Sequence, residues 1–183
     1  MKIFFEGIIL KPWSITDAGQ LVLIADNKKI ADNIRDGLPS PYTLKDALAW
    51  LNLILPENDP PRFFAIESDR QLVGNIGLVS KTNIYRKNLE IGFFISENFW
   101  GKGIATRAIK AATSYAFTNF DIVRMYAEVF SDNAGSRRAL EKAGFRLEAT
   151  LRNSIIKNEV IKDSCIYSIL KDDFKPMDVE VKI

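Results

Sequence analysis

The sequence predicts one domain of the α+β class. Segments that alternate apolar and polar residues, as strands do, are interspersed with segments whose apolar residues recur at helical spacing. No internal repeat, low-complexity tract or evident linker interrupts them. The chain has 183 residues, 47% of them hydrophobic, which is the size of a single globular domain with its own core. We assign this domain to residues 1–171 and a loose C-terminal tail to residues 172–183.

Prolines and capping residues divide the first half of the chain. Pro12 ends the first strand, and Pro56 follows the second helix, because proline disfavours helical conformation in the residue before it. Residues 68–70 are few enough to join two strands as a hairpin. The expected elements are a strand at 3–13, a helix from Ser14 or Thr16 to about 27, a helix from Thr43 or Lys45 to 55, strands at 62–67 and 71–79, and a strand at 89–96.

The second half alternates helices and strands in the same way. Ile104, Ala108 and Ile109 lie on one face of a helix. Gly144 stands where a shorter helix ends, a common position for glycine. The expected elements are a helix at 103–120, a strand at 123–130, a helix at 134–143, and strands at 145–152 and 163–170.

Charge and hydropathy exclude several classes of function. The 25 basic and 23 acidic residues leave a net charge of only +2, spread along the sequence, so there is no electrostatic footprint for nucleic acid. Glu6 interrupts the apolar N-terminus, and no later stretch approaches the ~18 apolar residues of a membrane span. We therefore expect a soluble, cytoplasmic protein with no nucleic-acid or membrane partner. A small anionic ligand remains open.

The absence of histidine restricts the chemistry further. Without an imidazole, the chain lacks the usual zinc ligand sets and cannot form a histidine-dependent catalytic triad. The single Cys165 cannot form an internal disulfide. We expect no metal site, and we interpret Cys165 as a small buried apolar residue rather than a nucleophile.

Residues 100–106, Trp-Gly-Lys-Gly-Ile-Ala-Thr, lie where a strand gives way to a helix. The free N–H groups at a helix N-terminus attract phosphates, and Gly101 and Gly103 let the backbone approach an anion closely. Lys102 would add charge. The spacing fits neither a dinucleotide-binding fingerprint nor a P-loop. Taken alone, the segment is explained equally well by a phosphate site or by a tight turn that begins a helix.

Other segments agree with one family. They are Gly74–Leu78, Leu89–Ile95, Trp100–Ala105 and Asn133–Phe145. With them, the sequence from about Gly7 to Leu170 resembles the GNAT superfamily of N-acetyltransferases, particularly its RimJ/RimL-like branch. The family's pyrophosphate loop reads Gln or Arg, two variable residues, Gly, one variable residue, then Gly or Ala. Here the second half matches, whereas the first position is Trp100.

The resemblance implies a mixed, mostly antiparallel central sheet with helices on both faces. Its fourth and fifth strands, 89–96 and 123–130, would splay apart, and the pantetheine arm of acetyl-CoA, the acetyl donor, would pair with strand backbone in that gap. The cofactor-binding residues that it implies are Phe94, Ile95, Ser96, Trp100, Gly101, Lys102, Gly103, Ile104, Ala105, Thr106, Asn133 and Ser136.

Acetyl transfer by direct attack in a ternary complex requires a base for the amine and an acid for the thiolate. Glu90, a carboxylate in an apolar strand beside the expected splay, is our candidate base. It could equally be a strand-edge glutamate that pairs with an arginine or faces water. Leu140 stands where many family members have a tyrosine acid, so Ser136 is the nearest replacement. Ser136 could also satisfy helix-start backbone groups, and Asn133 could orient a ligand or cap the helix.

The acceptor site is less clearly marked. The resemblance puts it near residues 33–42, Tyr85 and residues 152–158, with Tyr42 as an aromatic wall and Glu90 as a substrate contact. The acceptor is either a protein or peptide N-terminal α-amine or a small-molecule amine. Leu140 and Trp100 also keep open a second function, a sensor or regulatory module that binds CoA or acetyl-CoA with little catalysis. The helix around Trp50 fits a core position or a homodimer contact.

Overall fold

The computed structural model describes residues 1–57, 59–177 and 179–182. The strands are β1 Lys2–Phe5, β2 Ile8–Pro12, β3 Phe63–Ser68, β4 Gln71–Ser80, β5 Asn88–Ile95, β6 Arg124–Phe130, β7 Arg146–Lys157, β8 Val160–Leu170 and β9 Glu180–Lys182. The α-helices are α1 Ala18–Ala25, α2 Lys28–Ala31, α3 Leu44–Ile54, α4 Ile104–Asn119 and α5 Ala134–Lys142. Short 3-10 helices, η1 to η4, span Ile15–Asp17, Leu55–Glu57, Asn83–Tyr85 and Glu97–Phe99.

The strands form one sheet in the order β7-β8-β6-β5-β4-β3-β2-β1-β9. Neighbouring strands are antiparallel except β5 and β6, which are parallel. This confirms the expected mixed, mostly antiparallel sheet.

None of the helices in the part of the chain that the structure describes is long and apolar enough to cross a bilayer.

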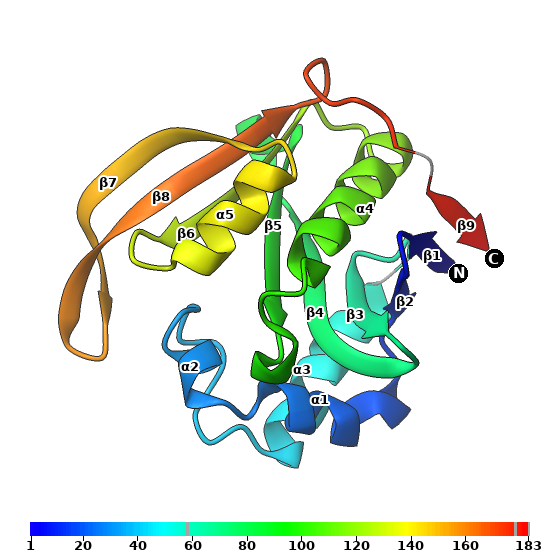
Figure 1. Ribbon diagram of the computed structural model, residues 1–183, viewed down its shortest axis with the longest axis vertical. Coiled ribbons are helices and arrows are strands. Elements are labelled where there is room, and N and C mark those ends of the chain that lie inside the picture. Colours follow the sequence, from blue (N-terminus) through cyan, green and yellow to red (C-terminus); the bar gives the residue numbers. More distant parts are fainter. Residues whose placement is uncertain (58, 178, 183) are drawn as a thin grey trace.

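Helices cover both faces of the sheet, as expected (Figure 1). On one face α4 and α5 pack against the larger core, and the fully buried Ala108, Ala112 and Ala116 let α4 lie close to the strands. On the other face α1 and α3 enclose a second core around Trp13 and Leu51. Strand alternation explains the division, because successive side chains point to opposite faces.

The parallel strands β5 and β6 separate soon after they begin. Only residues 88–90 of β5 pair with residues 124–126 of β6, although β5 continues to Ile95 and β6 to Phe130. Each strand keeps its other partner, β4 or β8, to its end. The expected splay is therefore confirmed. We call the point where pairing stops, at Glu90 and Tyr126, the fork.

Two elements near the N-terminus differ from the prediction. The single strand expected at 3–13 is a hairpin, because Glu6 and Gly7 both have positive φ, 43° and 81°, and form a two-residue turn between β1 and β2. The helix α2 was not predicted, since four residues are too few to show a helical period. Asn27 caps it by accepting from the N–H groups of Lys29 and Ile30.

The C-terminal tail is not loose, which corrects the sequence interpretation. The ring of Phe174 packs 5.3 Å from that of Phe117, and β9 pairs with β1 at the edge of the sheet (Figure 1). Apolar residues in a polar segment drive this docking. Residues 178 and 183 of the expected tail lie outside the described residues, and the domain boundary at residue 171 stays a prediction.

Candidate active site

The turn before α4 is built from two glycines in left-handed conformation. Gly101 and Gly103 have φ of 75° and 72°, which side-chain-bearing residues rarely adopt. Gly103 is the N-cap of α4, and no side chain caps the helix there. The first N–H groups of α4 therefore remain free to bind an anion.

A cavity of about 610 Å³ opens in front of this helix N-terminus. The expected cofactor residues all line it except Ser96 and Lys102, and it extends to α2 and α5. Its lining comprises Lys29, Ile30, Asn33, Ile34, Phe93, Phe94, Ile95, Phe99, Trp100, Gly101, Gly103, Ile104, Ala105, Thr106, Asp132, Asn133, Ala134, Gly135, Ser136, Arg138, Ala139 and Lys142. The sequence therefore located most of one wall, the β5–α4 junction.

The backbone of β5 offers different groups to the gap from those expected. Ser96 donates its N–H to Val73 of β4, and in an antiparallel ladder such bonds alternate along the strand. The backbone groups of Phe94 and Ser96 thus point to β4, and those of Phe93 and Ile95 point into the gap. The expected backbone pairing through Phe94 and Ser96 is wrong, because strand register could not be read from the sequence.

Trp100 links the turn before α4 to strand β5 by a hydrogen bond. Its indole Nε1 donates to the carbonyl oxygen of Ile95 at 2.6 Å, while the side chain remains 46% exposed. That carbonyl is one of the groups facing the gap. The neighbouring Lys102, expected to add charge, instead lies over the ring of Phe99 at 4.7 Å.

The carboxylate of Glu90 lies at the fork and is paired with two cations. Its two oxygens lie 2.6 Å from Arg35 Nη2 and 2.6 Å from Lys81 Nζ, and the Tyr126 hydroxyl donates at 3.4 Å. Burial raises the pKa of this carboxyl, but the Lys81 hydrogen bond and the Arg35 charge outweigh it, and the net pKa lies below its usual value. Glu90 does not line the cavity. The arginine-paired alternative is confirmed, and its role as a base stays a prediction.

Comparison with known proteins identifies the family. A family model described as "Acetyltransferase (GNAT) domain" matches residues 8–146. The chain belongs to the GNAT acetyltransferase family. The curated relative "Uncharacterized N-acetyltransferase YoaA" of Bacillus subtilis is 36% identical over 102 residues, 56% of this chain and 57% of its own length. The "Probable N-acetyltransferase YjcK" of the same species is 35% identical over 119 residues, 64% of this chain and 66% of its own length. The match thus spans less than two thirds of either relative.

Solved structures agree on the GNAT fold. Mycobacterium smegmatis RimJ, solved "in complex with CoA-disulfide", superposes with a TM-score of 0.81. The match covers 94% of this chain and 87% of that one at 22% sequence identity. This similarity confirms the expected RimJ/RimL-like architecture.

The start of α5 contributes Asn133 and Ser136 to the GNAT cavity. Asn133 Oδ1 accepts from the Ser136 N–H at 3.1 Å, so Asn133 caps the helix, as one alternative expected. The Ser136 hydroxyl makes no hydrogen bond within residues 1–57, 59–177 and 179–182, which leaves it available to a ligand. Leu140, at the family's tyrosine position, is fully buried in the core.

Cys165 is also buried, which confirms its interpretation as a small buried apolar residue.

Tyr42 does not form a wall of the cavity. Its side chain is 4% exposed and packs in the core beneath α1 and α3, and burial raises its pKa to about 12. The expected acceptor contact is thus displaced by a packing role, since an aromatic ring between two helices buries more apolar surface. Trp50 likewise stacks edge-on between Trp13 and Phe63, which assigns it to the core. Tyr85 is exposed and lies outside the cavity lining.

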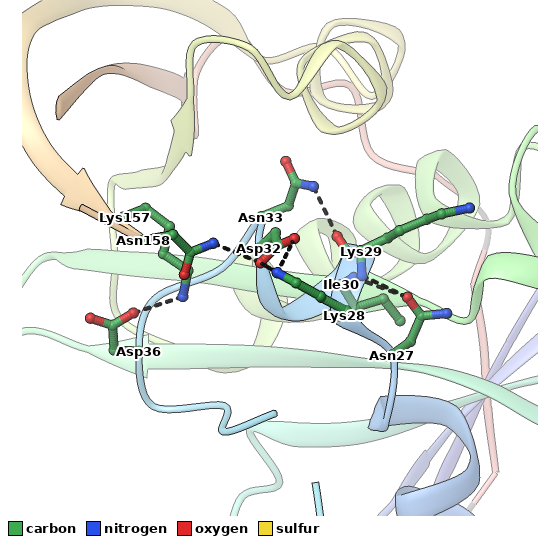
Figure 2. Close-up of polar contacts among 9 residues, drawn as sticks. All are labelled: Asn27, Lys28, Lys29, Ile30, Asp32, Asn33, Asp36, Lys157 and Asn158. Carbon is green, nitrogen blue, oxygen red and sulfur yellow. Dashed lines mark hydrogen bonds and ion pairs between the residues drawn. The ribbon is translucent and has the colours of Figure 1, made fainter. Parts of the chain in front are cut away.

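The two chain segments expected near the acceptor do meet. Figure 2 shows Lys157 at the end of β7 paired with Asp36 at 2.7 Å, and Asn158 bonded to Asp32 at 2.8 Å. Lys28 also holds Asp32 from one helical turn earlier, as the dashed lines in Figure 2 mark. These contacts fix α2 and the residues after it against the tip of the β7–β8 hairpin.

The sequence missed the cationic residues of the cavity. Lys29, Arg138 and Lys142 line it from α2 and α5. Arg138 and Lys142 are four residues apart and so share a helix face, a spacing that could have revealed them. Lys29 comes from the unpredicted α2 and pairs with Glu97, and no local pattern indicates such a contact.

Proposed function

We propose that this protein is an acetyl-CoA-dependent N-acetyltransferase that acetylates a primary amine. The observation that carries the proposal is a cavity bounded by the splayed strand β5, the uncapped N-terminus of α4 and the start of α5. Such a site has free N–H groups for a pyrophosphate at one end and free strand backbone for an amide-containing arm along one side. The family of the chain and the names of its relatives support the same activity.

The cavity has the donor groups that acetyl-CoA requires. The turn at Gly101 and Gly103 would hold the pyrophosphate, and the open space around both glycines leaves the backbone accessible. The backbone of Phe93 and Ile95 would pair with the pantetheine amides, once the Ile95 carbonyl exchanges the Trp100 indole for the ligand. Arg138 and Lys142 would add positive charge beside the nucleotide phosphates.

The reaction needs positioning and two proton transfers. The neutral amine nitrogen attacks the thioester carbonyl carbon, a C–N bond forms, and a backbone N–H in the gap stabilises the oxyanion. The C–S bond then breaks. The amine proton passes to Glu90, directly or through a water, and the departing thiolate takes a proton from the Ser136 hydroxyl. Ser136 regains a proton from solvent as Glu90 releases its own. The products are an N-acetyl amide and CoA.

A CoA-binding sensor is the second candidate. The bond from the Trp100 indole to Ile95 occupies a backbone group that a pantetheine arm would use, and Leu140 offers no acid. The first feature hinders the pantetheine pairing that would position the thioester, and the second removes an acid for the thiolate, so both would slow the chemistry.

Two measurements test these functions. Calorimetric titration with acetyl-CoA should give one site of micromolar affinity, and no binding at high micromolar concentration would overturn both candidates. Thiol release from acetyl-CoA in the presence of an amine panel then separates them. Turnover above the rate with water alone supports the enzyme, and binding without turnover for any amine supports the sensor.

A further inference from the structure

Arg35 bridges the two strands of the fork from outside the cavity. A single nitrogen, Nη2, lies 2.6 Å from Glu90 Oε1 on β5 and 3.0 Å from Glu128 Oε2 on β6. Glu90 belongs to the last parallel pair, and Glu128 follows that pair by two residues on β6. The arginine thus spans the point where the strands part.

The two carboxylates are more buried than the arginine and have further hydrogen-bond partners. The Glu90 and Glu128 side chains are 10% and 27% exposed, whereas that of Arg35 is 64% exposed. Ser164 donates to the second oxygen of Glu128 at 2.8 Å, and Lys81 occupies the second oxygen of Glu90. Within the described part of the chain, the Arg35 guanidinium makes no polar contact beyond these two carboxylates, so another cation can replace it without breaking other interactions.

The geometry suits a primary ammonium better than a guanidinium. A guanidinium binds carboxylates best through two nitrogens on one carboxylate, and here one nitrogen serves two carboxylates. An ammonium group has three N–H donors on one nitrogen and matches that arrangement. The charges agree, because Glu90, Glu128 and Lys81 together carry one net negative charge, which one monovalent cation balances.

The site also adjoins the cavity. Ile34, the residue before Arg35, lines the cavity together with Ile30 and Asn33. If Arg35 swings out, the carboxylate pair loses this cation. Arg35 belongs to the segment between Asn33 and Asp36, which Figure 2 shows beside the tip of the β7–β8 hairpin. An acceptor that enters there would meet the carboxylates at the base of the gap proposed for the pantetheine arm.

We propose that Arg35 occupies the acceptor's ammonium subsite, and that the acceptor enters as a primary alkylammonium that displaces Arg35 from Glu90 and Glu128. This inference rests on the proposed N-acetyltransferase function and names its class of acceptor. Arg35 is then a positioning residue that competes with substrate, and Glu128 is a substrate-binding residue.

The exchange of cations fits the chemistry of the site. Departure of Arg35 removes one of the two cations that stabilise the Glu90 carboxylate, which makes Glu90 a stronger proton acceptor. The ammonium gives one proton to Glu90, which passes it to water, and becomes the neutral nucleophile. Glu90 is then free to take the second proton during the attack. The product amide has no charge and loses its attraction to both carboxylates, so Arg35 can return as the product leaves.

The test compares Arg35→Gln with Lys45→Gln, a matched loss of one cation from an exposed position of α3 that lies outside the cavity lining. With 1,4-diaminobutane as the acceptor, Arg35→Gln should lower the KM for the amine about tenfold and leave the KM for acetyl-CoA unchanged, because an internal competitor is gone. Lys45→Gln should behave as the natural protein does. Glu128→Gln should raise the KM for the amine about tenfold.

Binding supplies a readout that does not depend on turnover. Calorimetric titration of 1,4-diaminobutane into the CoA-saturated protein should show tighter binding for Arg35→Gln and weaker binding for Glu128→Gln. Tighter binding without turnover would keep the subsite and overturn the proposed enzyme function. Turnover with the amine KM unchanged in Arg35→Gln would overturn the subsite alone, and so would the absence of diamine binding in every variant. Should Arg35→Gln not fold, the Glu128→Gln titration decides.

Discussion

At the level of single residues, the chemistry depends on the cations that balance the charge of the Glu90 carboxylate. Two cations hold it ionised, and the lower pKa that results makes it a weaker base than an isolated buried carboxyl would be. An ionised carboxylate can still accept a proton from the attacking amine, because the nitrogen becomes more acidic as it bonds to the thioester carbon. The site therefore depends on position more than on base strength.

Replacing Glu90 tests that role. Glu90→Gln should lower kcat about 100-fold, since an amide cannot take the proton, with little change in acetyl-CoA affinity. Steady-state kinetics between pH 6 and 9 provide the measurement, with Glu67→Gln on β3 as a control in the same sheet. A rate that stays the same at every pH would remove Glu90 from the mechanism.

The same substitution has a pH-dependent effect on stability. Because the folded pKa of Glu90 is lowered, its ion pairs stabilise the fold above the unfolded pKa, and that contribution is lost as the pH falls through the folded value. The free energy of unfolding lost in Glu90→Gln should be about 1–3 kcal/mol at pH 7 and should shrink as the pH is lowered through the folded pKa. Urea denaturation across an acid pH series measures it. A loss that grows as the pH falls would contradict the ion-pair assignment.

Residue-level prediction from sequence was limited by distance along the chain. Glu90 was proposed because it is a carboxylate in an apolar strand, and Ser136 because it lies one helical turn before Leu140. Arg35 was missed because no local pattern couples it to a strand that begins more than 50 residues later. Lys81 is nearer to Glu90 along the chain, but their contact depends on how β4 and β5 pair. The ion pairs that tune a candidate base are formed only by the tertiary fold.

At the scale of elements, the turn into α4 positions the cavity. Gly103→Asn should keep the left-handed backbone, which asparagine tolerates, while its side chain enters the open space in front of the helix. We expect acetyl-CoA affinity to fall at least about tenfold with a loss of unfolding free energy of about 1 kcal/mol or less. Calorimetry and thermal unfolding measure the two effects. Unchanged affinity would show that the ligand does not approach this backbone.

Gly19→Ala is the control for that substitution. Gly19 lies in α1 with nothing within 4 Å of its missing Cβ. Alanine there should leave acetyl-CoA affinity unchanged and stabilise the protein by about 0.5–1 kcal/mol, because alanine favours helix. A fall in affinity would mean that distant glycine substitutions perturb the site in general.

Long periodic elements were predictable, and short ones were not. The helix expected at 103–120 is α4, Ile104–Asn119, because apolar spacing that persists over 16 residues leaves little ambiguity. The turn between β1 and β2 and the helix α2 involve two and four residues, too few for any period. Because α2 supplies a wall of the cavity, the sequence did not predict that part of the site.

At the scale of the whole molecule, the C-terminal segment closes one edge of the sheet far from the cavity. Phe174→Ala should cost about 1–2 kcal/mol of unfolding free energy, because a partly buried ring on Phe117 is lost, and acetyl-CoA affinity should not change. Thermal unfolding and calorimetry check both, with the exposed Ile84→Ala as control. A loss of acetyl-CoA affinity would contradict the separation of tail and site.

The global architecture followed from the sequence more reliably than its details did. Alternating strands and helices indicated an α+β domain, and the resemblance supplied the splayed sheet. The register of β5 against β4 decides whether the backbone N–H and C=O groups of Phe93 or those of Phe94 point into the gap. Side-chain patterns do not reveal this backbone pairing. The docking of Phe174 likewise depends on contacts across more than 50 residues of chain.

Acetyl transfer to a primary amine can be detected by mass spectrometry of the product. The protein is incubated with acetyl-CoA and a panel of small primary amines and peptide N-termini. We predict an acetylated amine that forms only with the protein present and whose yield falls sharply in Glu90→Gln. Binding of acetyl-CoA with no acetylated product from any amine would contradict the proposed activity.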